Sequence, residues 1–528
     1  MRAAPTARQG ERCVKTSPTI ALAFVLAVAA VGAAAFWLGR QERGVQAARD
    51  ARSDAELDRI QAAERETDPY RRCVAYPNPA EFNWSPALVE AMCVRLQRRM
   101  LGWKDIQDAL DAHQPQALQA AFDGYLARNE AGEHGFLEWT FWWMFQSPSH
   151  WADDTTRRWV EADPASAHAH VARGMHLVAR AWQARGTDTA DKTSESAFAD
   201  TAGQVAKARA EFEQALQLNA RHLGAYYGLL HTSQLGTDDD EDAKRERWIA
   251  AALAIDPADG WIYQEWMNAM RPQWGGSLAR MREVAAAAAA HADANPTLAL
   301  LAAEPLCNEA DAYRCDGCDK DGARSLALYR KAGEIGPAAC FLDGAGAAAV
   351  LAQDIPAATR YYSQAYRFLA RDEWLAYRAQ NLRSLGRGDW ALADLQGANT
   401  RNPSNATVLH ALALAYADAG RIGDVEKAYR RMLEIEPDNV VAATDLAKLY
   451  LGDLHQPERA RPLVDHLLEG DPKSVPGWFV RTMLCEAADD KPCYREAAAH
   501  FLEYANPNDP WLEPQIRSVR SKLAEIGS

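Results

Sequence analysis

Glycine and proline are scarce in this sequence, with 32 and 25 copies among 528 residues, and no stretch sustains an alternation of apolar and polar residues. That alternation is the signature of a half-buried strand, and its absence argues against a sheet. Alanine, the strongest helix former, is abundant, and residues 285–290 are all alanine. We therefore expect an all-α protein with essentially no β-sheet.

The sequence also lacks the motifs by which many enzymes are recognised. It contains no Gly-x-Ser-x-Gly, no phosphate-binding Gly-x4-Gly-Lys, no His-Glu-x-x-His and no dinucleotide-binding Gly-x-Gly-x-x-Gly. His168 and His170 lie two residues apart, so they diverge on a helix, and we expect surface or groove histidines rather than ligands. We therefore expect no enzymatic activity, no cofactor and no bound metal.

A basic stripe is missing as well, and the net charge of the chain is -14. An acidic body repels the phosphate backbone of DNA and RNA. We therefore do not expect a nucleic-acid partner.

One long run carries no charge, from Ile20 to Leu38, and its 19 residues would span about 28 Å as a helix, close to the thickness of a bilayer core. Trp37 and Arg40 suit the membrane interface. A cleaved signal peptide ending at residues 33–35 is the alternative, but the apolar run continues past that site. We predict a tail at 1–17, a transmembrane anchor at 18–39 and a charged stalk at 40–66.

Nine cysteines divide unevenly, because Cys13 precedes the apolar run and the other eight follow it in local groups. Clustered cysteines in even number suit an oxidising compartment. We therefore predict a bacterial inner-membrane protein with one span and its body in the periplasm. The disulfide candidates are Cys73 with Cys93; Cys307, Cys315, Cys318 and Cys340; and Cys485 with Cys493.

Two of these groups differ in how far the sequence defines them. Four thiolates at Cys307, Cys315, Cys318 and Cys340 could bind zinc in a reducing compartment, or form two disulfides in one of three connectivities. Cys485 and Cys493 bracket a turn at 489–492, so a disulfide there would join the two helices of one hairpin.

A 34-residue repeat is visible at 406–439. Leu409, Ala413 and Tyr416 share one face of a first helix, Gly420 marks a turn, and Pro437 ends a second helix. This pattern resembles the tetratricopeptide repeat, in which stacked helical hairpins bury one another's apolar faces. Copies in register occupy 372–405, 440–474 and the segment from Val475, with a looser copy at 338–371. We predict a superhelical tetratricopeptide array over 297–528.

The preceding residues, 67–296, carry irregular helical hairpins in the same style. Their motifs are Trp159-x4-Pro164, Ala172-Arg173-Gly174, Ala181 to Gly186, and Pro272-Gln273-Trp274-Gly275-Gly276-Ser277. Together they resemble an uncharacterised bacterial domain of unknown function with a Pro-Arg-Trp-Gly-Gly-Ser motif, in which Gln273 replaces the arginine. The resemblance, over roughly 100–290, implies an all-helical envelope protein and no known activity.

Two features of this half have a structural and a functional reading. The turn at Trp274–Ser277 could cradle an anion, or Ser277 could cap the next helix while Trp274 wedges between hairpins. An aromatic cluster could form a buried core stripe, or a platform for glycans or a partner helix. Its members are Phe136, Trp139, Phe141, Trp142, Trp143, Phe145 and Trp151.

We expect a scaffold that binds a protein or peptide on the face lined by the first helices of the array. The repeat register places six residues there: Gln380, Arg383, His410, Thr444, Lys448 and Phe479. The alternative is an envelope assembly or immunity-type component that acts through the aromatic amino-terminal half. The oligomeric state and the identity of the partner stay open.

Overall fold

The computed structural model describes residues 53–186, 192–236, 240–314, 320–507, 509 and 512–527. It divides into two units, residues 1–65 and 66–528. Of the first unit only residues 53–65 are described, and 53–63 are helical. The predicted tail at 1–17, the anchor at 18–39 and residues 40–52 of the stalk lie outside the described residues. Among the residues that are described, no helix is both long and apolar enough to cross a bilayer.

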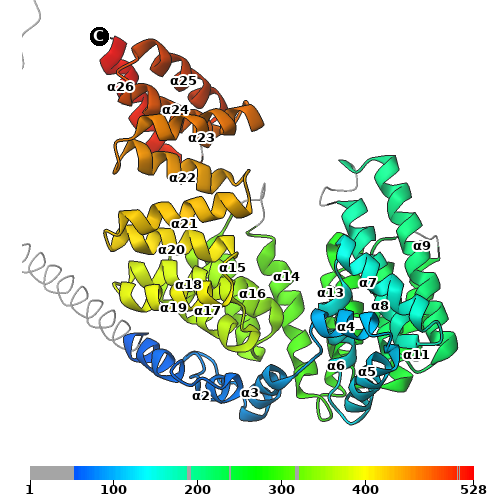
Figure 1. Ribbon diagram of the computed structural model, residues 1–528. Helices are drawn as coiled ribbons and strands as arrows, with labels where there is room; N and C mark the ends of the chain where they lie inside the picture. Colours follow the sequence, from blue (N-terminus) through cyan, green and yellow to red (C-terminus); the bar gives the residue numbers. More distant parts are fainter. Residues whose placement is uncertain are drawn as a thin grey trace, which may run out of the picture. The chain divides into compact units, whose positions relative to one another are not determined.

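The second unit is built from helices throughout its described part, as the composition predicts (Figure 1). The described residues of its amino-terminal half contain twelve α-helices and two 3-10 helices before residue 290. They are α2 (Pro69–Ala75), α3 (Pro86–Cys93), η1 (Val94–Gln97), α4 (Trp103–Asp111), α5 (Pro115–Glu130), α6 (Phe136–Phe145), α7 (His150–Ala162), α8 (Ala167–Arg185), α9 (Glu195–Leu218), α10 (Leu223–Ser233), α11 (Glu241–Ile255), α12 (Gly260–Ala269) and, after η3 (Pro272–Trp274), α13 (Leu278–Ala289).

The carboxyl-terminal half continues as hairpins in which a first and a second helix alternate. After η4 (Pro296–Ala303), they are α14 (Glu304–Asp311) with α15 (Gly322–Ile335), α16 (Ala339–Leu351) with α17 (Ile355–Leu369), α18 (Asp372–Ser384) with α19 (Gly388–Arg401), α20 (Ala406–Asp418) with α21 (Ile422–Ile435), α22 (Val440–Leu451) with α23 (Pro457–Gly470), and α24 (Val475–Ala487) with α25 (Lys491–Tyr504), followed by α26 (Glu513–Gly527). Each hairpin packs against the hairpins that precede and follow it in the chain (Figure 1).

Local sequence explains where these helices begin and end. Asn439 caps α22 by accepting a hydrogen bond from the backbone N–H of Ala442 at 2.9 Å, and Ser166 caps α8 in the same way. Gly420, at the predicted turn between α20 and α21, has a φ of 68°, a conformation that costs a residue with a side chain energy. First helices start 33 to 35 residues apart, and the predicted tetratricopeptide-type hairpins are confirmed.

Small residues let the hairpins approach and aromatic residues fill the space between them. Ala413 and Ala447 are fully buried in one core with Tyr429 and Tyr450. A second core joins α4–α12 around Phe122, and others lie farther along the chain. Each of these cores combines a hairpin with at least one further helix, so no hairpin buries its apolar face alone.

One core does not follow the order of the chain. Residues of α2 and α3, with Phe82 and Trp84 between them, are buried together with residues 300–374 of the carboxyl-terminal half. A disulfide joins Cys73 to Cys93 within the early segment, and another joins Cys307 to Cys340 within the later one. This core crosses the boundary predicted at residue 296, because the earliest helices of the unit pack on hairpins more than 200 residues later.

Candidate partner-binding site

The chain itself fills one groove of the array. We call residues 76–85, the segment between α2 and α3 that lacks regular helix, the inserted segment. Trp84 donates a hydrogen bond from Nε1 to the carbonyl of Gly333 in α15 at 2.6 Å. Gln364 in α17 donates from Nε2 to the carbonyl of Pro77 at 2.9 Å. Both helices are second helices of adjacent hairpins, so the segment lies between them.

Aromatic side chains anchor the inserted segment in this groove. The ring of Phe82 lies 5.5 Å from that of Phe341 in α16 and 6.1 Å from that of Tyr361 in α17. Gly333 makes room for it, since a Cβ atom at that position would lie 2.4 Å from the Phe82 ring. The groove thus has two second helices as its walls and an aromatic residue of the first helix between them as its floor.

Polar side chains complete the contact. Tyr361 donates from its hydroxyl to Glu81 at 2.8 Å, and Arg367 donates from Nε to the carbonyl of Cys73 at 2.7 Å. Burial lowers the pKa of Arg367 to about 10, so the guanidinium remains charged at neutral pH. The bonds from Arg367 to the carbonyl of Cys73 and from Gln364 to the carbonyl of Pro77 show that the hairpins can hold a length of polypeptide by its main chain.

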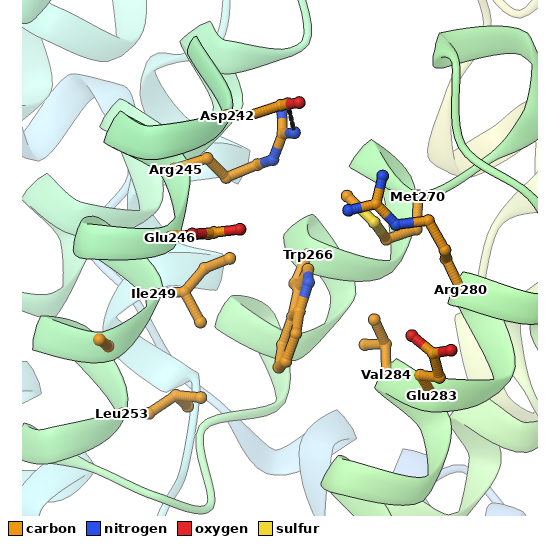
Figure 2. Close-up of a pocket in the computed structure, with 11 residues that line it drawn as sticks. Asp242, Arg245, Glu246, Ile249, Leu253, Trp266, Met270, Arg280, Glu283 and Val284 are labelled. Carbon is orange, nitrogen blue, oxygen red and sulfur yellow. Dashed lines mark hydrogen bonds and ion pairs between the residues drawn. The ribbon is translucent and has the colours of Figure 1, made fainter. Parts of the chain in front are cut away.

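A groove of the same construction is open between α11 and α13 (Figure 2). Trp266 of the first helix α12 rises in its middle, with Ile249 and Leu253 of α11 on one side and Val284 of α13 on the other. The groove has a volume of about 390 Å³. Its walls are apolar at the centre, as the walls around Phe82 are.

Charged residues form the rim of this open groove. Arg245 forms an ion pair with Asp242 of the same helix, and Glu246 lies one residue farther along. Arg280 and Glu283 stand on the α13 side (Figure 2). An apolar centre with a charged rim suits an aromatic side chain flanked by polar backbone or side-chain groups.

Two further hollows lie between second helices near the carboxyl end. One, of about 530 Å³, lies between α21 and α23 over Tyr450, and the other, of about 290 Å³, lies between α23 and α25 beside Trp478. Grooves between second helices therefore recur along the unit, and the one between α15 and α17 is occupied.

The residues predicted on the first-helix face lie on the expected helices but are largely engaged with one another. Arg383 forms an ion pair with Asp418, and Lys448 lies 3.2 Å from Asp445. His410 lies 3.6 Å from the same Asp445. Thr444 is buried, Phe479 packs against Phe501, and only Gln380 is exposed.

These contacts neutralise the charge of the first-helix face. Burial raises the pKa of Asp445, but hydrogen bonds from His410 and Lys448 outweigh burial, and the net pKa lies below the ordinary value. Asp445 is therefore ionised at neutral pH and balances the cations beside it. The repeat register located the face, but it could not show that neighbouring hairpins supply acids to it.

The aromatic cluster divides between the two readings that its sequence allowed. Phe136, Phe141 and Phe145 are fully buried, whereas Trp143 is 60% exposed and Trp142 36% exposed. The helix α6 turns its phenylalanine flank toward the core and leaves Trp142 and Trp143 exposed on another flank. Trp142 instead meets Trp261 at 5.7 Å between ring centroids.

Two other expectations are settled in this half. His168, His170 and His176 are buried, not on the surface, and the Nδ1 atom of His168 lies 2.9 Å from Nε2 of His222. Ser277 caps α13, accepting from the N–H of Arg280 at 3.2 Å, as the structural reading of the turn requires. Trp274 does not wedge into a core, since it is 42% exposed.

The cysteines pair within their groups wherever the structure describes them. Cys485 joins Cys493 across the turn between α24 and α25, in addition to the two disulfides of the early core. Cys315 and Cys318 lie outside the described residues. The described residues contain no cluster of three or more potential metal ligands.

Comparison with known families supports both resemblances. Residues 103–237 match the model of a Domain of unknown function (DUF4034), which covers α4 to α10. The Pro272–Ser277 motif lies beyond the matched range. No curated protein matches the chain.

Solved structures of similar fold include tetratricopeptide proteins. One, from Parabacteroides merdae ATCC 43184, is 13% identical, covers 56% of this chain and 98% of its own, and has a TM-score of 0.32. The Cut9–Hcn1 hetero-tetramer of the APC/C is 11% identical, with coverage of 84% and 100% and a TM-score of 0.35. Naa15/Naa10 bound to HypK-THB is 13% identical, with coverage of 83% and 86% and a TM-score of 0.36.

Proposed function

We propose that this protein is a non-catalytic scaffold that binds an extended segment of a partner polypeptide in the groove between α11 and α13. The observation that carries the proposal is the inserted segment, which occupies the corresponding groove between α15 and α17 through Phe82 and Trp84. A partner would place an aromatic side chain over Trp266, where the apolar walls of the open groove meet.

The first-helix face is the less favoured surface for this partner. Its cations already pair with Asp418 and Asp445, so a ligand would have to displace internal ion pairs to reach them. The open groove presents apolar area instead, and burial of such area is the main driving force of association.

We further propose that residues 18–39 anchor the scaffold in a bacterial inner membrane with the body in the periplasm. The uncharged run from Ile20 to Leu38 and the paired cysteines of the body support this placement. Labelling with a thiol reagent that does not cross the inner membrane, applied to the chain with Ser528→Cys, tests it. A body on the cytoplasmic side would leave that thiol unlabelled in intact cells.

The binding test uses a synthetic peptide with the sequence of residues 76–85 in which a photoreactive aromatic replaces Phe82. We expect light to attach it to α11 or α13 of the full chain in detergent, as mapped by mass spectrometry. Trp266→Ala should reduce attachment at least about tenfold, the cost of losing a central aromatic contact. Trp143→Ala, which removes an exposed tryptophan outside the groove, is the matched control.

Two outcomes would contradict the proposal. Attachment only to α15 and α17 would mean that the peptide exchanges with the inserted segment and that the open groove does not receive it. Equal attachment in the Trp266→Ala and unsubstituted chains would place binding elsewhere. Charge reversal at Arg383 and Lys448, which leaves the open groove unchanged, reports on the first-helix face in the same assay.

A second candidate function rests on the exposed Trp142 and Trp143. Adjacent exposed tryptophans are unusual on a monomer surface, and they would form a contact surface for a second protein in an envelope assembly. Trp142→Ala with Trp143→Ala should then abolish an assembly that Trp266→Ala leaves unchanged. Point variants are preferable to deletion of 67–296, because Trp84 and Cys73 belong to the core of the later hairpins.

A further inference from the structure

A second cavity, separate from the grooves, lies where the early and late helices of the second unit meet. Met92 of α3, Arg95 of η1, Trp261 of α12, Leu298 of η4 and Asp343 of α16 all line it. Its volume is about 590 Å³, within the range of about 300–1,000 Å³ that is usual for small-molecule sites. Segments from these five elements converge on the cavity, as is expected of a binding site and not of a shallow surface depression.

Arg95 brings a positive charge without a counter-charge into this cavity. Its Nη2 donates to the hydroxyl of Thr297 at 2.9 Å, and no carboxylate of the described residues forms an ion pair with it. Burial lowers the pKa of Arg95 to about 10, so it is still a cation at neutral pH. Arg95 is partly buried. A partly buried guanidinium without an acid beside it is costly, and an anionic group of a ligand would lower that cost.

Asp343 brings the opposite charge from the α16 side. No cation of the described residues lies in ion-pair contact with it, although Glu304 in the same cavity is paired with Arg271 at 3.0 Å. Asp343 is solvent-exposed at the edge of this cavity. The carboxylate is therefore available to a cationic group of a ligand.

Apart from His134 and the ion pair of Arg271 with Glu304, the remaining lining of the cavity is apolar or bears amide or hydroxyl side chains. Leu298 and Leu301 supply aliphatic area, and Trp261 and Trp274 supply aromatic area. Gln264 donates from Nε2 to Oδ1 of Asn268 at 3.2 Å, and both amide side chains line the cavity. Such a surface suits an apolar side chain and a peptide-type amide more than a phosphate or a metal ion.

We propose that this cavity binds a zwitterionic ligand of the amino-acid or short-peptide class, with its carboxylate on Arg95 and its ammonium group on Asp343. The two charged residues do not pair with each other, so the ligand has to span the distance between them. A dipeptide with an aliphatic side chain meets the charge pattern, the amide partners and the volume. This site is independent of the partner groove at Trp266.

The test titrates the full chain in detergent with L-leucyl-L-leucine, followed by calorimetry and by the fluorescence of the tryptophans. We expect saturable binding. Acetylation of the amino group and amidation of the carboxyl group of the peptide should each weaken binding at least about tenfold, because each removes one charged hydrogen bond.

Variants then assign the two charges. Arg95→Gln should weaken binding of the free dipeptide and make that binding insensitive to amidation of the carboxyl group. Asp343→Asn should make binding insensitive to acetylation of the amino group. Arg99→Gln, two residues past the end of η1, and Glu334→Gln, on the neighbouring helix α15, remove exposed charges and should change nothing. Thr297→Val breaks the hydrogen bond to Arg95 but keeps its charge, so retained binding separates ligand contact from support of the fold.

Several results would overturn the proposal. Absence of binding at millimolar dipeptide, or equal binding of the free and blocked peptides, would show that the cavity does not recognise a zwitterionic ligand. Tighter binding of D-glucuronate than of the dipeptide would show that the cavity takes an acidic saccharide and that Asp343 has no ammonium partner. The attachment assay at Trp266 is unaffected by any of these results, so failure here is distinguishable from failure of the proposed scaffold function.

Discussion

The indole nitrogen of Trp84 donates a 2.6 Å hydrogen bond to the backbone carbonyl of Gly333, 249 residues farther along the chain. Both partners are buried, and the ring of Trp84 also lies 6.2 Å from that of Phe341. A single contact thus ties the beginning of the second unit to its later hairpins. The amino-terminal and carboxyl-terminal halves are for this reason not independent domains joined by a linker.

Substitutions at Trp84 should measure how much this contact contributes to the free energy of unfolding. Trp84→Ala removes a buried aromatic ring and should lower the free energy of unfolding by about 3–5 kcal/mol. Trp84→Phe keeps most of the ring, loses the hydrogen bond and leaves the carbonyl of Gly333 without it, at a cost of about 1–3 kcal/mol. Urea denaturation followed by circular dichroism gives both values. Equal stability of the Phe variant and the unsubstituted chain would show that the bond contributes nothing.

Two glycines on opposite sides of Phe212 define a second close contact. A Cβ atom at Gly228 of α10 would lie 2.2 Å from the Phe212 ring, and one at Gly174 of α8 would lie 2.5 Å from it. Gly228→Ala should destabilise the chain by about 1–3 kcal/mol, because the ring cannot move without disturbing a full core. The change is read from the urea midpoint.

Gly203 offers the matched control on α9, the helix that carries Phe212. Nothing lies within 4 Å of a Cβ atom at that position, so Gly203→Ala should stabilise the chain by about 0.5–1 kcal/mol through helix propensity alone. Stabilisation by both alanines would contradict the packing assigned to Phe212.

The sequence was informative where one helix and its neighbour decide the outcome. The 34-residue period gave the hairpins from α18 to α25, since Ala413, Ala447 and Tyr450 act between adjacent repeats. It could not give the position of Phe82 and Trp84, because no period links residue 84 to residue 333. The sequence did not decide between burial and exposure of Trp143 for a similar reason, because the helix is apolar all round and its pattern does not choose a core face.

The candidate sites were harder to predict than the fold. The register placed Arg383 and Lys448 on one face, yet their acidic partners come from other turns and other hairpins. The open groove at Trp266 has no sequence signal of its own, because its walls are the same apolar residues that fill a core elsewhere. A search for exposed aromatic residues on first helices could have suggested it.

The disulfide between Cys73 and Cys93 should contribute more to stability than the one between Cys485 and Cys493. It closes a loop of 20 residues rather than 8, and loop-closure entropy predicts contributions of about 3 and about 2 kcal/mol. Replacing each pair with serine and comparing urea midpoints checks the order. Faster hydrogen exchange at residues 76–85 should accompany the loss of the first disulfide only, because that disulfide flanks the inserted segment. If hydrogen exchange at residues 76–85 is unchanged when Cys73 and Cys93 are replaced, the groove holds the inserted segment without the disulfide.

Two buried carboxyl groups should make the stability of the chain depend on pH. Burial raises the pKa of Asp259 to about 7, and burial together with the nearby Asp259 raises the pKa of Glu138 well above its ordinary value. Oδ1 of Asp259 caps α12 by accepting from the N–H of Trp261 at 2.8 Å, while its Oδ2 and both carboxylate oxygens of Glu138 have no hydrogen-bond partner among the described residues. The protonated forms are therefore favoured in the folded state.

The sign of the effect follows from this comparison of folded and unfolded chains. In the unfolded chain both groups titrate near pH 4, so between about pH 4 and 7 the folded state holds more protons than the unfolded state and its stability falls as pH rises. The loss contributed by Asp259 should be complete about one pH unit above 7 and on the order of 4 kcal/mol. Asp259→Asn keeps an oxygen for the helix cap but cannot ionise, so its urea midpoint should change less between pH 5 and pH 8 than that of the unsubstituted chain. Asp123→Asn, a half-exposed acid beside His168, is the control expected to leave most of the slope in place. A slope that survives in the chain with both Asp259→Asn and Glu138→Gln would show that other groups carry the pH dependence and that these two carboxyl groups are ionised within the fold.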